Sequence, residues 1–398
     1  MGISLRAQNL PVSSIRKLIP FADKAKAQGA HVYHLNIGQP DVKSPEIMLE
    51  PLKDLDMNPV PYAPSLGTKE MRETMANYYH NLGYENVSYE SIAIATGASE
   101  AIVMTLFSLC DVDDEVMVFE PFYSGYSVLA QMCGVKLVPI ETRIENGFHI
   151  PQREVIEKAI TKKTKAMLFS NPCNPTGAVY KKEAIDMLAD IAKKHDIVLI
   201  SDEVYREYIF VDRPHASLLP YLSSIPKHIV VIDSLSKRYS MCGLRLGSVL
   251  TQNKELFQSI NKIATGRLSA GIIDQFVGAQ AVNVPEQYFK EVQAEYKKRR
   301  DVLFEGLKQI DGVEVSQPEG AFYSMVKLPV ENAEQFCVWM LEEFRDNNET
   351  VMFAPGEGFY ATKGKGVDEV RMAYVINCDD LKRSVELLSK ALTQYTSG

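Results

Sequence analysis

The sequence has little of what marks secreted, membrane-spanning or metal-binding proteins. Its six cysteines are scattered, with no CxxC pair and no grouping with histidine at the spacing of a zinc site. No apolar run approaches the roughly 18 residues of a membrane span, and the first residues lack the apolar core of a signal peptide. Positive charge is also scarce, since 43 Lys and Arg stand against 51 Asp and Glu, which disfavours nucleic acid as a partner. We therefore expect a cytoplasmic protein with reduced thiols and no metal site.

What the sequence does have is a regular alternation of short apolar segments with amphipathic ones through its middle. Such segments predict strands and helices in turn. The predicted strands are residues 92–95, 115–119, 136–140, 166–170, 197–201 and 229–232, and the predicted helices between them include 99–110 and 182–195. This order predicts an α/β fold with a mainly parallel sheet covered on both faces. Residues 247–251 are interpreted as a further, antiparallel strand.

The character of the chain changes after about residue 290. A long charged helix is predicted for residues 286–310, and short strands and helices are predicted after it at 312–315, 322–326, 333–346 and 369–375. A chain of 398 residues suggests two or three domains. We expect an N-terminal arm and part of a small domain in residues 1–45, a large α/β domain in 46–290, and the rest of the small α+β domain in 291–398.

One stretch after a predicted strand combines groups that suit an aldehyde and a phosphate. The apolar strand 229–232 is followed by Ser234, Lys237 and Arg245. A Lys amine that loses its proton is a nucleophile toward an aldehyde, and an Arg with Ser hydroxyls can hold a phosphate dianion. An aldehyde and a phosphate together describe pyridoxal phosphate (PLP). A solvated Lys on a surface loop is equally consistent with this motif alone.

Chemically active side chains follow other predicted strands, at the edge where an open α/β sheet binds its ligands. The turn Thr96–Glu100 offers backbone N–H groups to an anion, or it only caps the helix that follows. Tyr123 can stack on a flat ring or pack in a core. Asn174 lies in a rigid turn with two Asn-Pro steps, and its amide can donate to a phenolate oxygen.

The strand 197–201 is followed directly by a carboxylate, Asp202. A buried carboxylate without a partner is costly, whereas a protonated pyridine nitrogen would stabilise it and would be kept cationic by it. Tyr205 can reach the same phenolate oxygen as Asn174. The alternative for Asp202 is the cap of a following helix.

Together these residues resemble the fold type I PLP-dependent enzymes, and most closely the class I/II aminotransferases, over nearly the whole chain. The motifs that carry the resemblance are Asn36–Asp41, Tyr62–Gly67, Asn171–Gly177, Ser201–Tyr205, Ser234–Gly247 and Val370–Val375. The resemblance implies a large PLP-binding domain built on a mainly parallel, seven-stranded type of sheet, with a smaller α+β domain formed by both chain ends.

The resemblance also implies roles for the matching residues at the cofactor. Lys237 would be linked covalently to PLP and would move the substrate's α-proton, and Asp202 would pair with the pyridine nitrogen. Tyr205 and Asn174 would hold the phenolate oxygen, while Tyr123 would stack on the ring. The residues expected to hold the phosphate are Ala98, Ser99, Ser234 and Arg245.

Three further residues are placed by the resemblance at the substrate or at a second subunit. Tyr62 would reach the phosphate of the partner subunit, which implies a homodimer with shared active sites. Gly38 would lie on a mobile N-terminal segment that closes over the substrate. Arg371 would bind the substrate's α-carboxylate with two hydrogen bonds from its guanidinium. The alternative role for Arg371 is that of a strand residue in a surface ion pair.

The implied reaction is the transfer of an amino group from an L-amino acid to a 2-oxo acid, with an aspartate aminotransferase-like enzyme as the leading interpretation. A side-chain carboxylate needs a second cation, and some aspartate-acting relatives place a Lys where this chain has Ser99. Arg267 is a candidate substitute near the partner's pocket. Aromatic amino acids or methionine, and a PLP-dependent carbon–sulfur lyase, remain alternatives. A ligand-sensing regulator is disfavoured by the acidic charge and by the lack of room for a DNA-binding domain.

Overall fold

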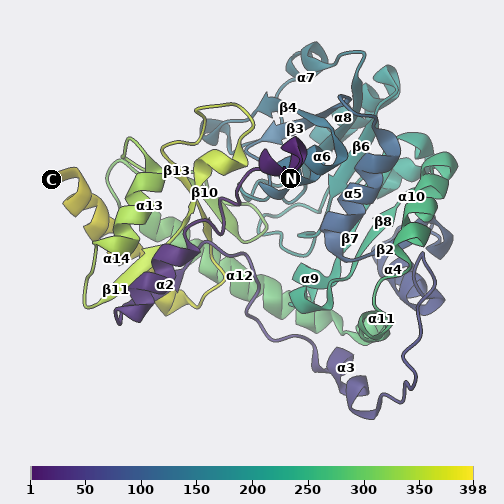
Figure 1. Ribbon diagram of the computed structural model, residues 1–398, viewed down its shortest axis with the longest axis horizontal. Helices are drawn as coiled ribbons and strands as arrows, with labels where there is room; N and C mark the ends of the chain where they lie inside the picture. Colours follow the sequence, from purple (N-terminus) through teal and green to yellow (C-terminus); the bar gives the residue numbers. More distant parts are fainter. Residues whose placement is uncertain (1, 398) are drawn as a thin grey trace.

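Seven strands form the central sheet, in the order β2-β8-β7-β6-β5-β3-β4 (Figure 1). The structure is a computed structural model and describes residues 2–397. The strands are β2 (Ile92–Ala95), β3 (Glu115–Glu120), β4 (Lys136–Glu141), β5 (Thr164–Ser170), β6 (Val198–Asp202), β7 (Ile229–Ser234) and β8 (Gly247–Leu250). Only β8 runs antiparallel to its neighbours. The predicted α/β fold, its mainly parallel sheet and its antiparallel strand are confirmed.

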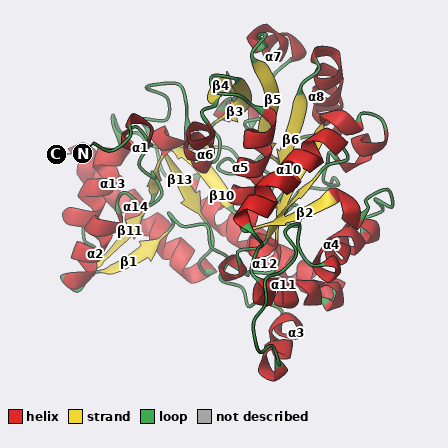
Figure 2. Ribbon diagram, turned by 45° about the vertical axis from the view of Figure 1, so that its right-hand side comes forward, coloured by secondary structure: helices red, strands yellow, loops and turns green. Residues whose placement is uncertain are grey.

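Helices cover both faces of this sheet (Figure 2). They are α4 (Lys69–Asn81), α5 (Gly97–Leu109), α6 (Gly125–Cys133), α7 (Arg153–Ala159), α8 (Lys182–His195), α10 (Lys254–Arg267) and α11 (Ile272–Ala279). Alternate strand residues enter different cores: Ile92 and Ile94 pack with α4, α8 and α11, whereas Ala93 and Ala95 pack with α5, α6 and α10. Because both faces are buried, most of these strands contain a continuous apolar segment, which allowed them to be predicted from the sequence.

A second group of elements comes from both ends of the chain (Figure 1). Strand β1 (His31–His34) pairs in parallel with β11 (Glu349–Met352), and a four-stranded sheet has the order β12-β13-β10-β9. The other strands are β9 (Glu314–Val315), β10 (Tyr323–Lys327), β12 (Ala354–Pro355) and β13 (Glu369–Ala373), and the helices are α2 (Ile19–Ala27), α12 (Glu286–Leu307), α13 (Ala333–Glu342) and α14 (Cys378–Ser397). Helix α12 spans residue 290, and the domain boundaries there and at residue 45 stay predictions.

Three short helices complete the α-helical elements that the structure describes, namely α1 (Leu5–Gln8), α3 (Glu46–Leu49) and α9 (Leu235–Arg238). Figures 1 and 2 both show α3 and the chain that follows it extending away from the rest of the molecule. Within residues 2–397, no helix combines the length and the apolar character that crossing a membrane requires.

The predicted helix 333–346 is wrong at its end, because α13 stops at Glu342. Side chains from beyond the helix take its last carbonyl groups. Arg345 donates to the carbonyl oxygens of Met340 and Leu341, and the hydroxyl of Thr350 also donates to that of Met340. These bonds satisfy the helix terminus and let the chain turn into β11.

Candidate active site

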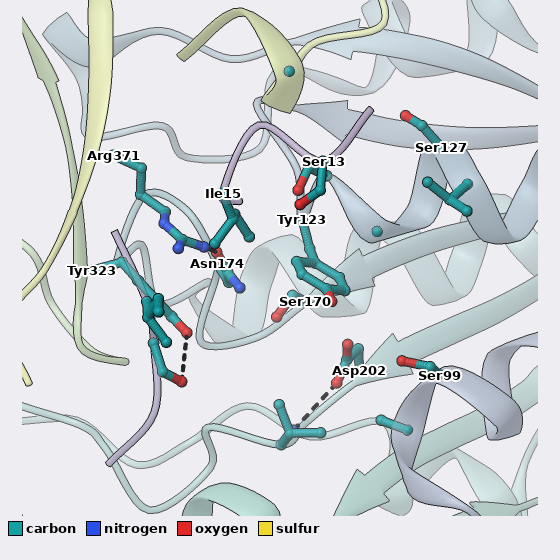
Figure 3. Close-up of a pocket in the computed structure, with 18 of the residues that line it drawn as sticks. Ser13, Ile15, Ser99, Tyr123, Ser127, Ser170, Asn174, Asp202, Tyr323 and Arg371 are labelled. Atoms are coloured by element: carbon teal, nitrogen blue, oxygen red, sulfur yellow. Dashed lines mark hydrogen bonds between the residues drawn. The ribbon is translucent and has the colours of Figure 1, made fainter. Parts of the chain in front are cut away.

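A cavity of about 500 Å³ lies at the carboxyl ends of the parallel strands, between the central sheet and the four-stranded sheet (Figure 3). Its size is that of an ordinary small-molecule site. All of the predicted site residues except Tyr62 and Arg267 line it: Gly38, Ala98, Ser99, Tyr123, Asn174, Asp202, Tyr205, Ser234, Lys237, Arg245 and Arg371. The structure therefore brings together residues that are more than 300 positions apart in the sequence.

The antiparallel strand β8 explains how Arg245 reaches this edge. Gly247, the first residue of β8, lies opposite Ala95 at the end of β2 and opposite Ser234 at the end of β7. Because β8 runs against its neighbours, its start meets their carboxyl ends, and Arg245 lies two residues before that start. A parallel strand at this place would put Arg245 at the opposite edge of the sheet.

The first turn of α5 and Arg245 form an anion-binding corner of the cavity. The side chain of Thr96 makes no capping bond to α5, although the carboxylate of Glu100 accepts from the Thr96 N–H at 2.5 Å, so the N–H groups of the following residues receive no bond from Thr96. An uncapped helix N-terminus presents free N–H groups and a positive dipole to an anion. The guanidinium of Arg245 lies close by, since a Cβ placed on Gly97 would be 2.7 Å from its Nη2 atom.

Ser234 lies in the same corner with its hydroxyl already bonded. It donates to the carbonyl oxygen of Leu246 at 2.7 Å and accepts from the N–H of Ser236 at 3.1 Å. A hydroxyl has a single proton, so Ser234 cannot donate to an anion while it keeps the bond to Leu246. Ser236, which the sequence analysis did not include, also lines the cavity.

Asp202 is a buried carboxylate at the end of β6, and no helix follows it for it to cap. The hydroxyl of Tyr126 donates to its Oδ2 atom at 2.8 Å, and the N–H of Val204 donates to Oδ1 at 3.4 Å. No described cation pairs with it. Burial therefore outweighs these bonds and raises the pKa of Asp202 to about 6. A cationic ring nitrogen in the cavity would supply the missing partner.

Lys237 follows β7 and lies on the short helix α9. Its Nζ atom donates to the carbonyl oxygen of Gly38 at 2.7 Å and lies 3.9 Å from the sulfur of Cys242. Gly38 also lies very close to Tyr323, because a Cβ at this position would lie 1.8 Å from the hydroxyl oxygen of that tyrosine. Only glycine fits this approach, which brings the N-terminal segment to the amine.

Arg371 is buried on β13, so the alternative of a surface ion pair is excluded. Its Nη2 atom donates to the carbonyl oxygen of Asn36 at 2.6 Å, and its Nη1 atom donates to Oδ1 of Asn174 at 3.1 Å. Its Nε atom has no partner among the described residues. Burial lowers the pKa of Arg371, and no described carboxylate compensates its charge. An anion entering the cavity would meet an incompletely bonded guanidinium.

A network of phenols lies between Arg371 and the sheet. The amide of Asn174 donates to the hydroxyl of Tyr205 at 3.5 Å, and the hydroxyls of Tyr205 and Tyr323 are 2.9 Å apart. The guanidinium of Arg371 lies 4.4 Å from the ring centre of Tyr323. Tyr123 lies above Asp202 in Figure 3, and its expected stacking on a flat ring stays a prediction. Burial raises the pKa of Tyr205 well above its usual range, so its hydroxyl stays a donor.

Sequence reasoning missed three parts of this cavity. No sequence pattern marked Tyr323 as a functional residue, because it only stood in a predicted strand. Asn36 stood in a quoted motif but was given no role, although it is fully buried and holds Arg371. The segment Pro11–Arg16 also lines the cavity, and Figure 3 shows Ser13 and Ile15 on it facing the other residues. No local pattern in the sequence marks this segment.

Two predicted residues lie outside the cavity. Tyr62 is 81% exposed, and its expected contact with a second subunit stays a prediction. Arg267 at the end of α10 donates from Nη1 to Oε2 of Glu100 at 2.7 Å, and from Nη2 to the carbonyl oxygens of Ser65 and Ile94. Within this chain Arg267 thus holds the back of the α5 turn, and its expected approach to the partner's pocket stays a prediction.

The chain is similar to proteins of known name over nearly its whole length. Residues 30–365 match the family described as aminotransferase class I and II. An aspartate aminotransferase of Pyrococcus horikoshii is 31% identical over 387 residues, which cover 96% of this chain and 94% of that protein. A probable N-acetyl-LL-diaminopimelate aminotransferase of Bacillus subtilis is 32% identical over 388 residues, again covering 96% and 94%. The solved structure of the aspartate aminotransferase of Thermus thermophilus with maleate matches with a TM-score of 0.88 and 28% identity, covering 98% of this chain and 100% of that one.

Proposed function

This chain belongs to the class I and II aminotransferases, and we propose that it uses PLP to move the amino group of aspartate to a 2-oxo acid. It is an aspartate aminotransferase-like transaminase of a PLP-dependent family. One observation carries the proposal for cofactor and substrate. Around a single cavity stand a buried carboxylate without a cation, the amine of Lys237, and the guanidinium of Arg371 with an unpartnered nitrogen.

The residues of the cavity fit PLP at each of its polar groups. Asp202 would hold the pyridine nitrogen, because its buried charge lacks any other cation. Asn174 and Tyr205 would donate to the phenolate oxygen, and Tyr123 would stack on the ring. The groups that would hold the phosphate are the guanidinium of Arg245, the first N–H groups of α5 with Ala98 and Ser99, and the hydroxyl of Ser234 after rotation away from Leu246. When bound, PLP supplies a cationic ring that takes up the electron pair left on the substrate's Cα.

Lys237 would hold the cofactor covalently and would afterwards carry the substrate's α-proton on its Nζ atom. The carbonyl oxygen of Gly38 accepts from this atom at 2.7 Å, and a carbonyl group can only accept. The contact therefore fixes the direction of one N–H bond and places the amine at the cavity wall. It also links the amine to the N-terminal segment, so a movement of that segment would free the amine.

Arg371 would bind the α-carboxylate of the amino acid. The bonds to Asn36 and Asn174 fix the plane of the guanidinium, and they leave Nε without a partner. A planar, immobile guanidinium binds a carboxylate with two parallel bonds and so orients the substrate. Asn174 would thereby touch both the phenolate oxygen and the arginine, and couple the position of the cofactor to that of the substrate.

We propose a homodimer from the surface around Tyr62. Both views of the fold show α3 projecting from the molecule. The exposed large apolar side chains on and near it are Ile47, Leu49, Leu52, Val60 and Tyr62. A monomer rarely exposes such a cluster, and a second copy would cover it. The scattered cysteines, all of them free, support a location in the reducing cytoplasm.

The test of the proposed function is Lys237→Ala against the control Lys262→Ala, which removes an exposed lysine of α10. The first variant should lose turnover and the visible absorbance of covalently held PLP, while the control should keep both. Borohydride reduction of the wild type should attach the cofactor at position 237, as seen by peptide mass. A Lys237→Ala enzyme with ordinary activity would contradict the proposal.

A donor screen separates the substrate classes. Aspartate, phenylalanine, methionine and alanine are compared with 2-oxoglutarate as the acceptor, and aspartate should react fastest. Undetectable transfer from aspartate would refute the proposed donor, and transfer from none of the four would refute the proposed reaction. Release of pyruvate from cystine without any acceptor would identify a lyase instead.

A further inference from the structure

The charges that line the cavity do not balance. Its lining includes four cationic side chains, Arg16, Lys237, Arg245 and Arg371, but Asp202 is the one carboxylate among the described residues that line it. Under the proposed function, three of these groups face the cofactor: Asp202 faces its ring nitrogen, Arg245 faces its phosphate, and Lys237 faces its carbonyl carbon. Arg371 faces the α-carboxylate of the substrate. Arg16 is the cation without an assigned anion.

The backbone of Arg16 is held firmly at the cavity. Its N–H donates to the carbonyl oxygen of Ser13 at 3.1 Å. On one side, the carbonyl oxygen of Ile15 accepts from the amide of Asn36 at 2.9 Å. On the other side, Lys17 forms an ion pair with Glu334. The segment is therefore anchored on both sides of Arg16.

The same asparagine also positions Arg371. The carbonyl oxygen of Asn36 accepts from Nη2 of Arg371 at 2.6 Å, while its side-chain amide holds Ile15. Asn36 is fully buried, so both bonds are shielded from water. Asn36 thus links the guanidinium of Arg371 to the backbone directly before Arg16. Figure 3 shows Ile15 of this segment beside Arg371.

The side chain of Arg16 is free, in contrast to its backbone. It is exposed at the cavity and makes no hydrogen bond or ion pair with any residue that the structure describes. Arg267, the second cation that the sequence suggested, is already bonded to Glu100 and to two carbonyl oxygens and lies outside the cavity lining. Within this chain, Arg16 is the cation with both the access and the bonding capacity to meet a second anion.

We propose that Arg16 binds the side-chain carboxylate of dicarboxylic substrates, aspartate, glutamate and 2-oxoglutarate, while Arg371 binds the α-carboxylate. This inference rests on the proposed function and names the residue that selects its substrate. An anchored backbone with a free guanidinium suits the role, because the long side chain adapts to acids of different length while its planar head keeps two parallel bonds to a carboxylate. Arg16 is a specificity-determining residue in this scheme.

The experiment compares single half-reactions of PLP-loaded wild type, Arg16→Gln and Arg16→Lys, without any oxo-acid acceptor. Omitting the acceptor matters because 2-oxoglutarate is itself dicarboxylic. The rate constant for aspartate should fall about 10- to 100-fold in Arg16→Gln, and Arg16→Lys should regain part of it. The rate constant for alanine, which has no second carboxylate, should change less than about threefold in either variant. Arg143→Gln, outside the cavity, is the control and should change neither.

A binding measurement makes the result independent of turnover. Maleate, an unreactive dicarboxylate, is titrated calorimetrically into each PLP-loaded protein, with propionate as the monocarboxylate. Arg16→Gln should weaken maleate about 10- to 100-fold and leave propionate nearly unchanged. Equal losses for both acids, or no loss for maleate, would overturn the role of Arg16. If the wild type reacts with alanine but neither uses aspartate nor binds maleate, the role of Arg16 is refuted while the aminotransferase activity is retained. If the protein fails to bind PLP at Lys237, the proposed function itself is refuted.

Discussion

The substitution Gly247→Ala should distort the anion-binding corner, which is formed by the first turn of α5 and Arg245, through one added methyl group. Gly247 starts β8 and lies against the first turn of α5. A Cβ at this position would be 2.4 Å from the carbonyl carbon of Gly97, 2.6 Å from the nitrogen of Ala98 and 2.8 Å from the carbonyl oxygen of Gly97. All three are backbone atoms, so no side-chain rotation relieves the contact.

The geometry sets the size of the effect. Ordinary contact begins at 3.4 Å, so the turn must recede from the strand by about 1 Å. Pairing of Ala95 with Gly247 resists that movement, because it holds the two strands together. Overpacking of this kind costs about 1–3 kcal/mol. If the cost falls on the turn that we propose to bind the phosphate, PLP affinity should drop roughly 5- to 150-fold, since 1.4 kcal/mol is a factor of ten.

Gly243 offers a matched control in the same loop, because a Cβ there meets no atom within 4 Å. Apoprotein of the wild type, Gly247→Ala and Gly243→Ala is titrated with PLP and followed by visible absorbance, and thermal unfolding checks that each variant is folded. Gly247→Ala should bind weakly and Gly243→Ala normally. Wild-type affinity in Gly247→Ala, or an equal loss in both variants, would show that the close approach does not shape the phosphate corner.

Two further perturbations test the electrostatics of the cavity. Burial raises the pKa of Asp202 from 3.8 to about 6, so the folded apoprotein binds this proton more tightly than the unfolded chain; the resulting stability is complete below the unfolded pKa and is lost as pH rises through the folded one. The unfolding free energy of the apoprotein relative to Asp202→Asn should therefore fall by about 3 kcal/mol between about pH 3 and pH 7 in denaturant titrations, and a constant difference would contradict the assigned cause. The substitution Arg267→Met should weaken PLP binding about tenfold, because it leaves the carboxylate of Glu100, which also accepts from the Thr96 N–H, without its cation behind the α5 turn. Adding Glu100→Gln should restore part of the affinity in a double-mutant cycle, and an additive result would argue that the pair does not act on the turn.

The sequence allowed the cofactor side of the cavity to be predicted because its signals are local. Most strands contain a continuous apolar segment, such as Ile92–Ala95 or Ile229–Ile232, since both faces of the sheet are buried. The residues proposed to act lie at or just beyond the strand ends, since Asp202 is the last residue of β6 and Lys237 lies three residues after β7. Parallel strands end at one edge, so residues at successive strand ends must meet there. The fold class and the grouping of these residues required no knowledge of distant contacts.

The substrate side could not be predicted in the same way, because its contacts join distant parts of the chain. Tyr323 reaches Tyr205 only because the four-stranded sheet lies over the ends of the central one. Asn36 meets Arg371 across 335 positions. A tyrosine or an asparagine at such a position has no periodic or turn signal that distinguishes it from a packing residue. Even the end of α13 depended on bonds from residues beyond the helix.

The cofactor side and the substrate side of the cavity lie on different structural units, and this separation affects how the substrate specificity can change. The groups proposed to hold the cofactor lie on the central sheet, whose strands and turns constrain one another through backbone pairing. The two arginines proposed to select the substrate lie outside that sheet, where Asn36 bonds the guanidinium of Arg371 and the carbonyl group of Ile15, the residue before Arg16. Exchange of residue 16 alters one exposed side chain and no backbone bond of the cofactor side. Specificity for the side chain can therefore change while the α-carboxylate site and the chemistry of Lys237 are kept, which is the separation expected when binding and reacting groups lie on different structural units.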